Sequence, residues 1–99
     1  MDHAGIAFAA GMLVPFDDEQ AEIKRLYVRP THQCEGVGRV LVQTLLDIAR
    51  DLGYRAVVLD VMSARPAAVG LYERSGFVAV QAFRTYPAHH GMRFYRRSL

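Results

Sequence analysis

The stretch that most constrains this chain lies at residues 29–43 and reads RPTHQCEGVGRVLVQ. Gly36 and Gly38 are separated by one residue. They lie where the spacing of apolar residues changes from that of a strand to that of a helix. Glycine allows unusual φ angles and close approach of the backbone to a ligand. Successive N–H groups from about residue 34 to residue 39 can therefore face one concavity at the start of a helix, where the helix dipole also favours an anion.

The loop by itself leaves two interpretations open: a phosphate site, or a tight turn that needs glycine for packing. It is not a Walker loop, because Gly38 is followed by Arg39 and Val40 instead of lysine and serine or threonine. It is also not a dinucleotide loop, which has a third glycine and begins directly after its strand.

The apolar spacing before and after the loop predicts an α/β chain. Residues 6–14 and 21–28 are expected to form a hairpin around the acidic turn PFDDEQ, and AVVLDV at 56–61 is expected to lie parallel to 21–28. The helix between them begins at Val37 and ends before Gly53. Its apolar residues form two adjacent stripes: Val37, Leu41, Leu45, Ile48 and Leu52, and Val42, Leu46 and Ala49.

A second helix is predicted from Pro66 to a glycine cap at Ser75-Gly76, with Ala68, Leu71 and Tyr72 facing inward. Strands are expected at 77–83 and 92–99. The order is β-β-α-β-α-β-β, which predicts one α/β domain over residues 1–99 with helices flanking a mixed sheet.

Strand 21–28 has an irregular pattern. Ile23 is apolar at an odd position, whereas Leu26 and Val28 are apolar at even positions. Either an extra residue near Lys24 or Arg25 forms a β-bulge that returns all three to one face, or both faces of the strand are buried.

Composition excludes several classes of protein. The chain has 99 residues, of which 52% are hydrophobic and 22% charged, as expected for a folded soluble domain rather than a disordered one. A net charge of +2 is too small to predict nucleic-acid binding. The single cysteine favours a reducing compartment, and the apolar run 6–14 lacks the preceding basic residues of a signal peptide. We therefore expect a cytoplasmic protein without membrane association, and the four histidines show no metal-binding spacing.

Three segments carry a resemblance to a known family. EIKRLYVRP (22–30), Gln33-x-x-Gly36-x-Gly38 and LDVMSARPAAVGLYERSGF (59–77) resemble the GNAT superfamily of acyl-CoA-dependent N-acetyltransferases. The resemblance covers about residues 5–99. It implies that acetyl-CoA is the co-substrate, and that a primary amine of a small molecule or peptide attacks the thioester directly.

The resemblance also implies a role for particular residues. The pantetheine arm would lie between strands 21–28 and 56–61, paired with the backbone of Leu26, Tyr27 and Val28. The pyrophosphate would be held by Gln33, Cys34, Glu35, Gly36, Val37, Gly38 and Arg39. Tyr72 would protonate the departing thiolate, or would only pack on the sheet. Glu22 would receive the proton of the amine through water, or would be a solvated carboxylate.

The chain departs from the family pattern at three places. Glu35 puts a negative charge beside the expected diphosphate, and Arg65 is a poor helix cap at a position where many relatives have asparagine. The usual N-terminal strand and helices, which form one wall of the acceptor pocket, do not precede the hairpin. Either the pocket is open, or a second copy of the chain supplies that wall, or the natural start lies elsewhere. Because the missing strand would also leave an exposed sheet edge, we expect a homodimer, for which exchange of the C-terminal strands is one arrangement. The alternative is a CoA-binding module that is catalytically weak or inactive.

Overall fold

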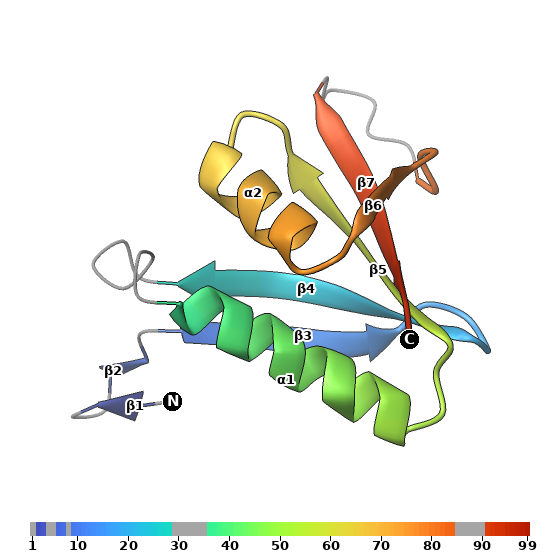
Figure 1. Ribbon diagram of the computed structural model, residues 1–99, viewed down its shortest axis with the longest axis horizontal. Helices are drawn as coiled ribbons and strands as arrows, with labels where there is room; N and C mark the ends of the chain where they lie inside the picture. The colour runs from blue at the N-terminus through green and yellow to red at the C-terminus, as the bar shows by residue number, and fades with distance from the viewer. Residues whose placement is uncertain (1, 4–5, 8, 29–35, 85–90) are drawn as a thin grey trace.

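A five-stranded mixed sheet carries both helices on one of its faces (Figure 1). The computed structural model describes residues 2–3, 6–7, 9–28, 36–84 and 91–99. The order of strands across the sheet is β3-β4-β5-β7-β6. Their bounds are Ala9–Pro15 for β3, Gln20–Val28 for β4, Ala56–Met62 for β5, Val78–Val80 for β6 and Met92–Ser98 for β7.

The connections follow the predicted order. Strands β3 and β4 form an antiparallel hairpin, and helix α1 (Val37–Asp51) crosses from β4 to the parallel strand β5. Helix α2 (Pro66–Arg74) leads to β6, and β7 lies between β5 and β6, antiparallel to both. The predicted mixed α/β sheet is confirmed. Among the described residues, neither helix has the length and hydropathy needed to cross a bilayer.

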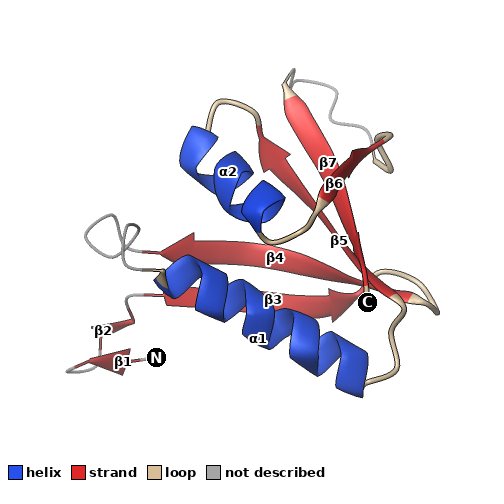
Figure 2. Cartoon of the chain, in the orientation of Figure 1, coloured by secondary structure: helices blue, strands red, loops and turns tan. Residues whose placement is uncertain are grey.

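The core is built from side chains of the two helices and of the strands that they cover. Figure 2 shows the helices lying over the sheet. Side chains alternate along each strand, so one set from β4 and β5 meets α1 while the other set faces the opposite side. Helix α1 buries Val42, Leu45, Leu46 and Ala49 against this set, and α2 adds Tyr72. The first predicted stripe of α1 is only partly correct, because Ile48 and Leu52 are exposed. At this end the helix extends past the sheet residues that it covers.

Of the two alternatives for the irregular pattern of β4, the structure shows the β-bulge. Strand β3 pairs Ala10 with Tyr27 but Met12 with Lys24, so two residues of β4 lie opposite Gly11. Arg25 takes a φ of 56°, in the left-handed region. Because of the extra residue, Leu26 packs against the same core as Ile23. A side chain at position 11 would meet Leu26 Cδ1 at 3.0 Å, so the glycine provides the space that this leucine fills.

Strands β4 and β5 separate soon after they begin to pair. Only three residue pairs join them in the described chain: Gln20–Ala56, Ala21–Val57 and Glu22–Val58. Beyond Glu22 the two strands diverge, as Figure 1 shows. The predicted parallel pair is therefore paired at one end and open at the other.

Two predicted strands were wrong in extent. Residues 6–14 are divided between β2 (Ile6–Ala7), which pairs with β1 (Asp2–His3) in a separate small sheet, and β3. The strand predicted at 77–83 ends at Val80. Phe83 instead stacks edge-to-face between Phe16 and Phe94, at ring-centroid distances of 5.0 and 4.8 Å. This stack draws the chain away from the line of β6 and across the sheet.

Because Arg25 has a left-handed conformation, we expect substitution by valine to destabilise the protein more at this position than at Arg93, a regular strand position. Arg25→Val should lower the free energy of unfolding by about 1–2 kcal/mol, because a β-branched residue is strained at positive φ. Arg93→Val, at an exposed position of the regular β7 ladder, should change it by less than about 0.5 kcal/mol. Chemical denaturation measures both, and equal effects would contradict the assigned bulge geometry.

Candidate active site

A cleft of about 1040 Å³ opens where β4 and β5 separate. One wall is β4 from Ile23 to Leu26, and the other is formed by β5 from Asp60 to Met62 together with α2. Gly36 and Gly38, at the start of α1, line the same space. The strand pair, Gly36 and Gly38 at the start of α1, and the second helix therefore line one space.

The side of β4 that faces the cleft is an open strand edge. Residues 23–28 make no ladder pairs with β5, so backbone N–H and C=O groups along this edge can pair with an extended ligand. Leu26 is half-buried and lines the cleft, whereas the Tyr27 side chain is 48% exposed. Val28 is the last residue of the strand. The three residues expected to hold the pantetheine arm lie along this edge or at its end.

The start of α1 forms the other end of the cleft. Gly36 takes a φ of 77° as the N-cap, and among the described residues no side chain caps the helix. The first turn contains no acidic residue. The first N–H groups of a helix lack partners within the helix and, with its dipole, favour an anion. Of the predicted phosphate loop, Val37 begins the helix and Arg39 lines the cleft; Gln33, Cys34 and Glu35 lie outside the described residues.

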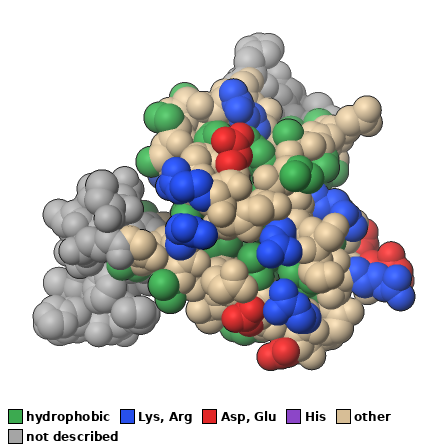
Figure 3. Space-filling model, viewed as in Figure 1, with side chains coloured by type: hydrophobic (Ala, Val, Ile, Leu, Met, Phe, Trp, Pro, Cys, Tyr) green, Lys and Arg blue, Asp and Glu red, His purple; other side chains and the backbone are tan. Residues whose placement is uncertain are grey.

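The charge of the described cleft lining is strongly positive. One acidic residue, Asp60, accompanies five basic ones: Lys24, Arg25, Arg39, Arg65 and Arg74. Figure 3 shows lysine and arginine side chains on this face between α2 and the start of α1. Such a lining suits a ligand with several negative charges.

Tyr72 reaches the cleft from α2. Its side chain is 6% exposed, and its ring packs edge-to-face on Phe77 with centroids 5.8 Å apart. Burial raises the pKa of Tyr72 to about 12, with smaller opposing effects from Arg65, which lowers it, and Asp60, which raises it. The hydroxyl is therefore protonated across the physiological range and can donate a hydrogen bond into the cleft.

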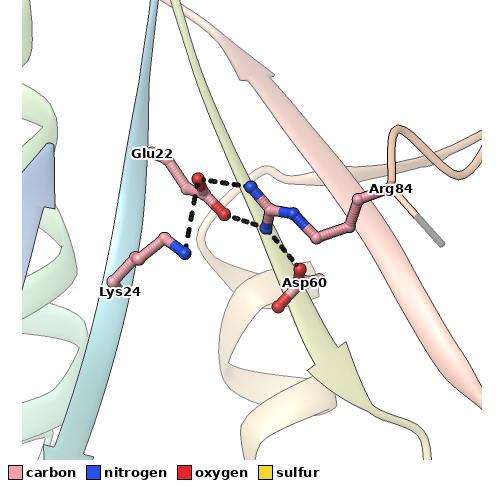
Figure 4. A network of polar contacts seen from close by, with 4 residues as sticks. All are labelled: Glu22, Lys24, Asp60 and Arg84. Atoms are coloured by element: carbon pink, nitrogen blue, oxygen red, sulfur yellow. Dashed lines mark hydrogen bonds and ion pairs between the residues drawn. The ribbon is translucent and has the colours of Figure 1, made fainter. Parts of the chain in front are cut away.

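Glu22 is not a solvated edge carboxylate. It is 3% exposed, and Arg84 holds both of its oxygens, with Nη1 donating to Oε2 at 2.5 Å and Nη2 to Oε1 at 2.9 Å (Figure 4). The same Nη1 donates to Asp60 Oδ2 at 2.7 Å. Lys24 Nζ lies 3.9 Å from Glu22 Oε1. The alternative that Glu22 is a solvated carboxylate is therefore wrong. Its partner in the structure is Arg84.

Sequence reasoning missed Arg84 and Asp60. Asp60 is the one charged residue in the apolar run AVVLDV, and an acid in such a run requires a partner nearby. That pattern could have pointed to a cation near Asp60. It could not have identified Arg84, because the position of that residue depends on the aromatic stack at Phe83.

Comparison with known proteins assigns the chain to a family. Residues 3–77 match the profile of the Acetyltransferase (GNAT) family. Because the match covers more than half of the chain, the protein belongs to the GNAT acetyltransferase family. The resemblance read from the sequence is confirmed.

Several named proteins are similar to this chain over part of their length. Human N-acetyltransferase 8B is 41% identical over 69 residues, which are 65% of this chain and 30% of that protein. The L-amino acid N-acyltransferase MnaT of Escherichia coli is 42% identical over 53 residues, or 54% of this chain and 31% of the relative. The chain thus spans about a third of the length of these two relatives.

Solved structures share the fold. A proposed acyl-CoA N-acyltransferase from Klebsiella pneumoniae superposes with a TM-score of 0.86 at 28% identity, over 94% of this chain and 64% of that one. A GNAT family acetyltransferase from Elizabethkingia anophelis, solved with acetyl-CoA bound, superposes with a TM-score of 0.80 at 20% identity, over 99% and 72%.

The raised pKa of Tyr72 predicts a loss of stability in alkali. The unfolded chain releases this proton near pH 10 and the folded chain near pH 12, so a contribution that is complete below pH 10 is lost as the pH rises from 10 to 12. Between pH 9.5 and 11.5 the free energy of unfolding should fall by about 2 kcal/mol more in the wild type than in Tyr72→Phe. Urea denaturation measures the difference.

Tyr54→Phe is the matched control, because Tyr54 packs at the edge of the same core and does not line the cleft. It should follow the wild-type curve. Parallel curves for the wild type and Tyr72→Phe would show that Tyr72 titrates normally.

Proposed function

We propose that the protein is an acetyl-CoA-dependent N-acetyltransferase that acts on a primary amine. The observation that carries this proposal is the continuity of the cleft, which joins the open edge of β4 to the uncapped start of α1. In coenzyme A, a linear tail that carries amide groups along its length is attached to a diphosphate. The strand edge suits the tail, and the helix start with its basic surroundings suits the phosphates.

The binding residues follow from this placement. Backbone groups of Leu26, Tyr27 and Val28 would pair with the amide groups of the tail. The N–H groups of Gly36, Val37, Gly38 and Arg39, with the Arg39 side chain, would hold the diphosphate. Gln33, Cys34 and Glu35 are assigned to the same site on the strength of the family resemblance.

In the proposed reaction a neutral amine attacks the thioester carbonyl, the new C–N bond forms, and the C–S bond breaks with the electron pair moving to sulfur. Tyr72 would supply a hydrogen bond, and finally a proton, to that sulfur. If the departing thiol has the reference pKa of a cysteine, about 8.5, a phenol with a pKa of about 12 gives up its proton to the thiolate at a cost of about 5 kcal/mol. Because of this cost, we expect Tyr72 to donate a hydrogen bond to the sulfur while negative charge develops there, and to transfer its proton completely only at a late stage.

Glu22 is the proposed acceptor of the amine's proton, through water. Its two oxygens already accept bonds from Arg84, but a carboxylate has lone pairs for further donors. Because the side chain is buried beside the paired end of β4 and β5, a water would have to carry the proton from the cleft to it.

The acceptor class and the assembly are separate proposals. MnaT, an L-amino acid N-acyltransferase, is among the similar proteins, so L-amino acids are the first acceptors to test, followed by peptides. We also propose a homodimer, because the sheet face away from α1 and α2 exposes Met12, Val78 and Val80, which do not line the cleft. Sedimentation velocity over a range of concentrations tests this, and a monomer throughout would contradict it.

Tyr72→Phe should lower kcat at least tenfold and change the Kd for acetyl-CoA less than twofold, because only the hydroxyl is removed. Thiol release with a panel of amines measures turnover, and calorimetry measures Kd. Tyr54→Phe should leave both unchanged. A Tyr72→Phe enzyme with wild-type turnover would remove this residue from the mechanism.

Ligand-dependent melting separates the proposed enzyme from its alternatives. Acetyl-CoA at about 100 times its Kd should stabilise the fold by about 2.7 kcal/mol, and ATP at the same concentration should do less. Stabilisation without turnover on any acceptor would favour a non-catalytic CoA-binding module. Equal stabilisation by ATP would favour a general nucleotide site.

A further inference from the structure

Arg84 lies where β4 and β5 begin to separate. Glu22, on β4, belongs to the last residue pair that joins the two strands, and Asp60, on β5, is two residues past its partner Val58. Arg84 Nη1 contacts both carboxylates, at 2.5 Å for Glu22 and 2.7 Å for Asp60. Figure 4 shows the guanidinium between the side chains of Glu22 and Asp60, with dashed lines to both.

The aromatic stack holds Arg84 at this position. Phe83 is fixed between Phe16, at the end of β3, and Phe94 on β7. The guanidinium carbon of Arg84 lies 5.2 Å from the centroid of the Phe83 ring, within the range of a cation–π contact. The guanidinium of Arg84 is therefore restrained by the Phe83 ring and by the two carboxylates.

Neutralising a buried charge explains only part of this arrangement. Glu22 is 4% exposed at its side chain and needs a cation, which the two-pronged contact with Arg84 provides. The contact with Asp60 is not needed for that purpose, since the Asp60 side chain is 18% exposed. What the second contact adds is a link between the two strands at the point where their backbone pairing stops.

We propose that Arg84 is a positioning residue that fixes the width of the closed end of the cleft by bridging Glu22 and Asp60. This inference rests on the proposed function. With the diphosphate at the start of α1 and the tail along β4, the acyl group lies toward the closed end, close to Tyr72 and Asp60. The bridge thereby sets the room for the acyl group and favours acetyl over longer chains.

Two conservative variants test the bridge without leaving Glu22 unpaired. Asp60→Asn removes the cross-strand charge and keeps the Glu22–Arg84 pair, and Arg84→Lys keeps a cation but loses the planar fork. Each should raise kcat/KM for butyryl-CoA relative to acetyl-CoA at least fivefold, with the Kd for CoA changed less than twofold. The ratio is the informative quantity, because a changed Tyr72 environment would alter both reactions alike.

Arg96→Met is the matched control, since Arg96 lies on the same sheet face and bonds to the neutral side chains of Gln20 and Ser98. It should leave the acyl-chain ratio unchanged. An unchanged ratio in both Asp60→Asn and Arg84→Lys, with reduced stability alone, would overturn the proposal and leave Arg84 as a structural ion pair.

A double-mutant cycle separates failure of the bridge from failure of the proposed function. If the bridge exists, the unfolding equilibrium constant of Asp60→Asn with Arg84→Lys should differ at least fivefold from the product of the single effects. An additive cycle overturns the bridge. A coupled cycle in a protein that binds neither acetyl-CoA nor CoA would instead overturn the proposed function, and with it the role of the bridge in acyl selection.

Discussion

The interruption of pairing between β4 and β5 is the constraint on which the site depends. Parallel strands are normally buried on both faces and paired along their length, so an opening between them leaves backbone groups without partners. In this protein the opening begins directly after the Glu22–Val58 pair and holds a basic cleft. The bulge at Arg25, the glycine start of α1 and the inward face of α2 all border it. The positive φ of Arg25 and the start of α1, for which no described side chain supplies a cap, each cost stability.

Charge is distributed differently on the two sides of this opening. Toward α1 and α2 the cleft is basic, as an anionic ligand requires. Toward the face that the helices leave uncovered, Glu22, Asp60 and Arg84 form a compact network. A buried ionic network is a poor source of stability compared with an apolar core, because desolvation opposes the attraction. Its value lies in geometry, since short contacts with a planar guanidinium permit few arrangements of the groups that they join.

Much of the fold was predictable because local rules and tertiary packing agree. The positions of both helices, the hairpin and the parallel crossover followed from apolar spacing and from glycine and proline at the expected places. The bulge was one of two alternatives that the apolar spacing left open. The errors lie where tertiary contacts override local preference. Val78 to Phe83 have the pattern of a strand, but Phe83 gains more from two neighbouring rings than from a place in β6. Ile48 and Leu52 continue an apolar stripe beyond the sheet that could cover it. The candidate site residues on β4, α1 and α2 were assigned from the family resemblance and stay a prediction. Arg84 could not be assigned from the sequence, because its position is set by contacts distant in sequence.

The bulge in β4 affects the course of the strand more than its apolar pattern. Without Arg25, Ile23 and Leu26 would be two residues apart, which is the spacing of a regular strand, and both would still face the core. The inserted residue is thus neutral with respect to the apolar pattern, while it takes an unfavourable backbone angle. A version of β4 one residue shorter would satisfy the core equally well and could continue straight alongside β5. The extra residue therefore adds nothing to the burial of Ile23 and Leu26, and it lines the opening between the two strands.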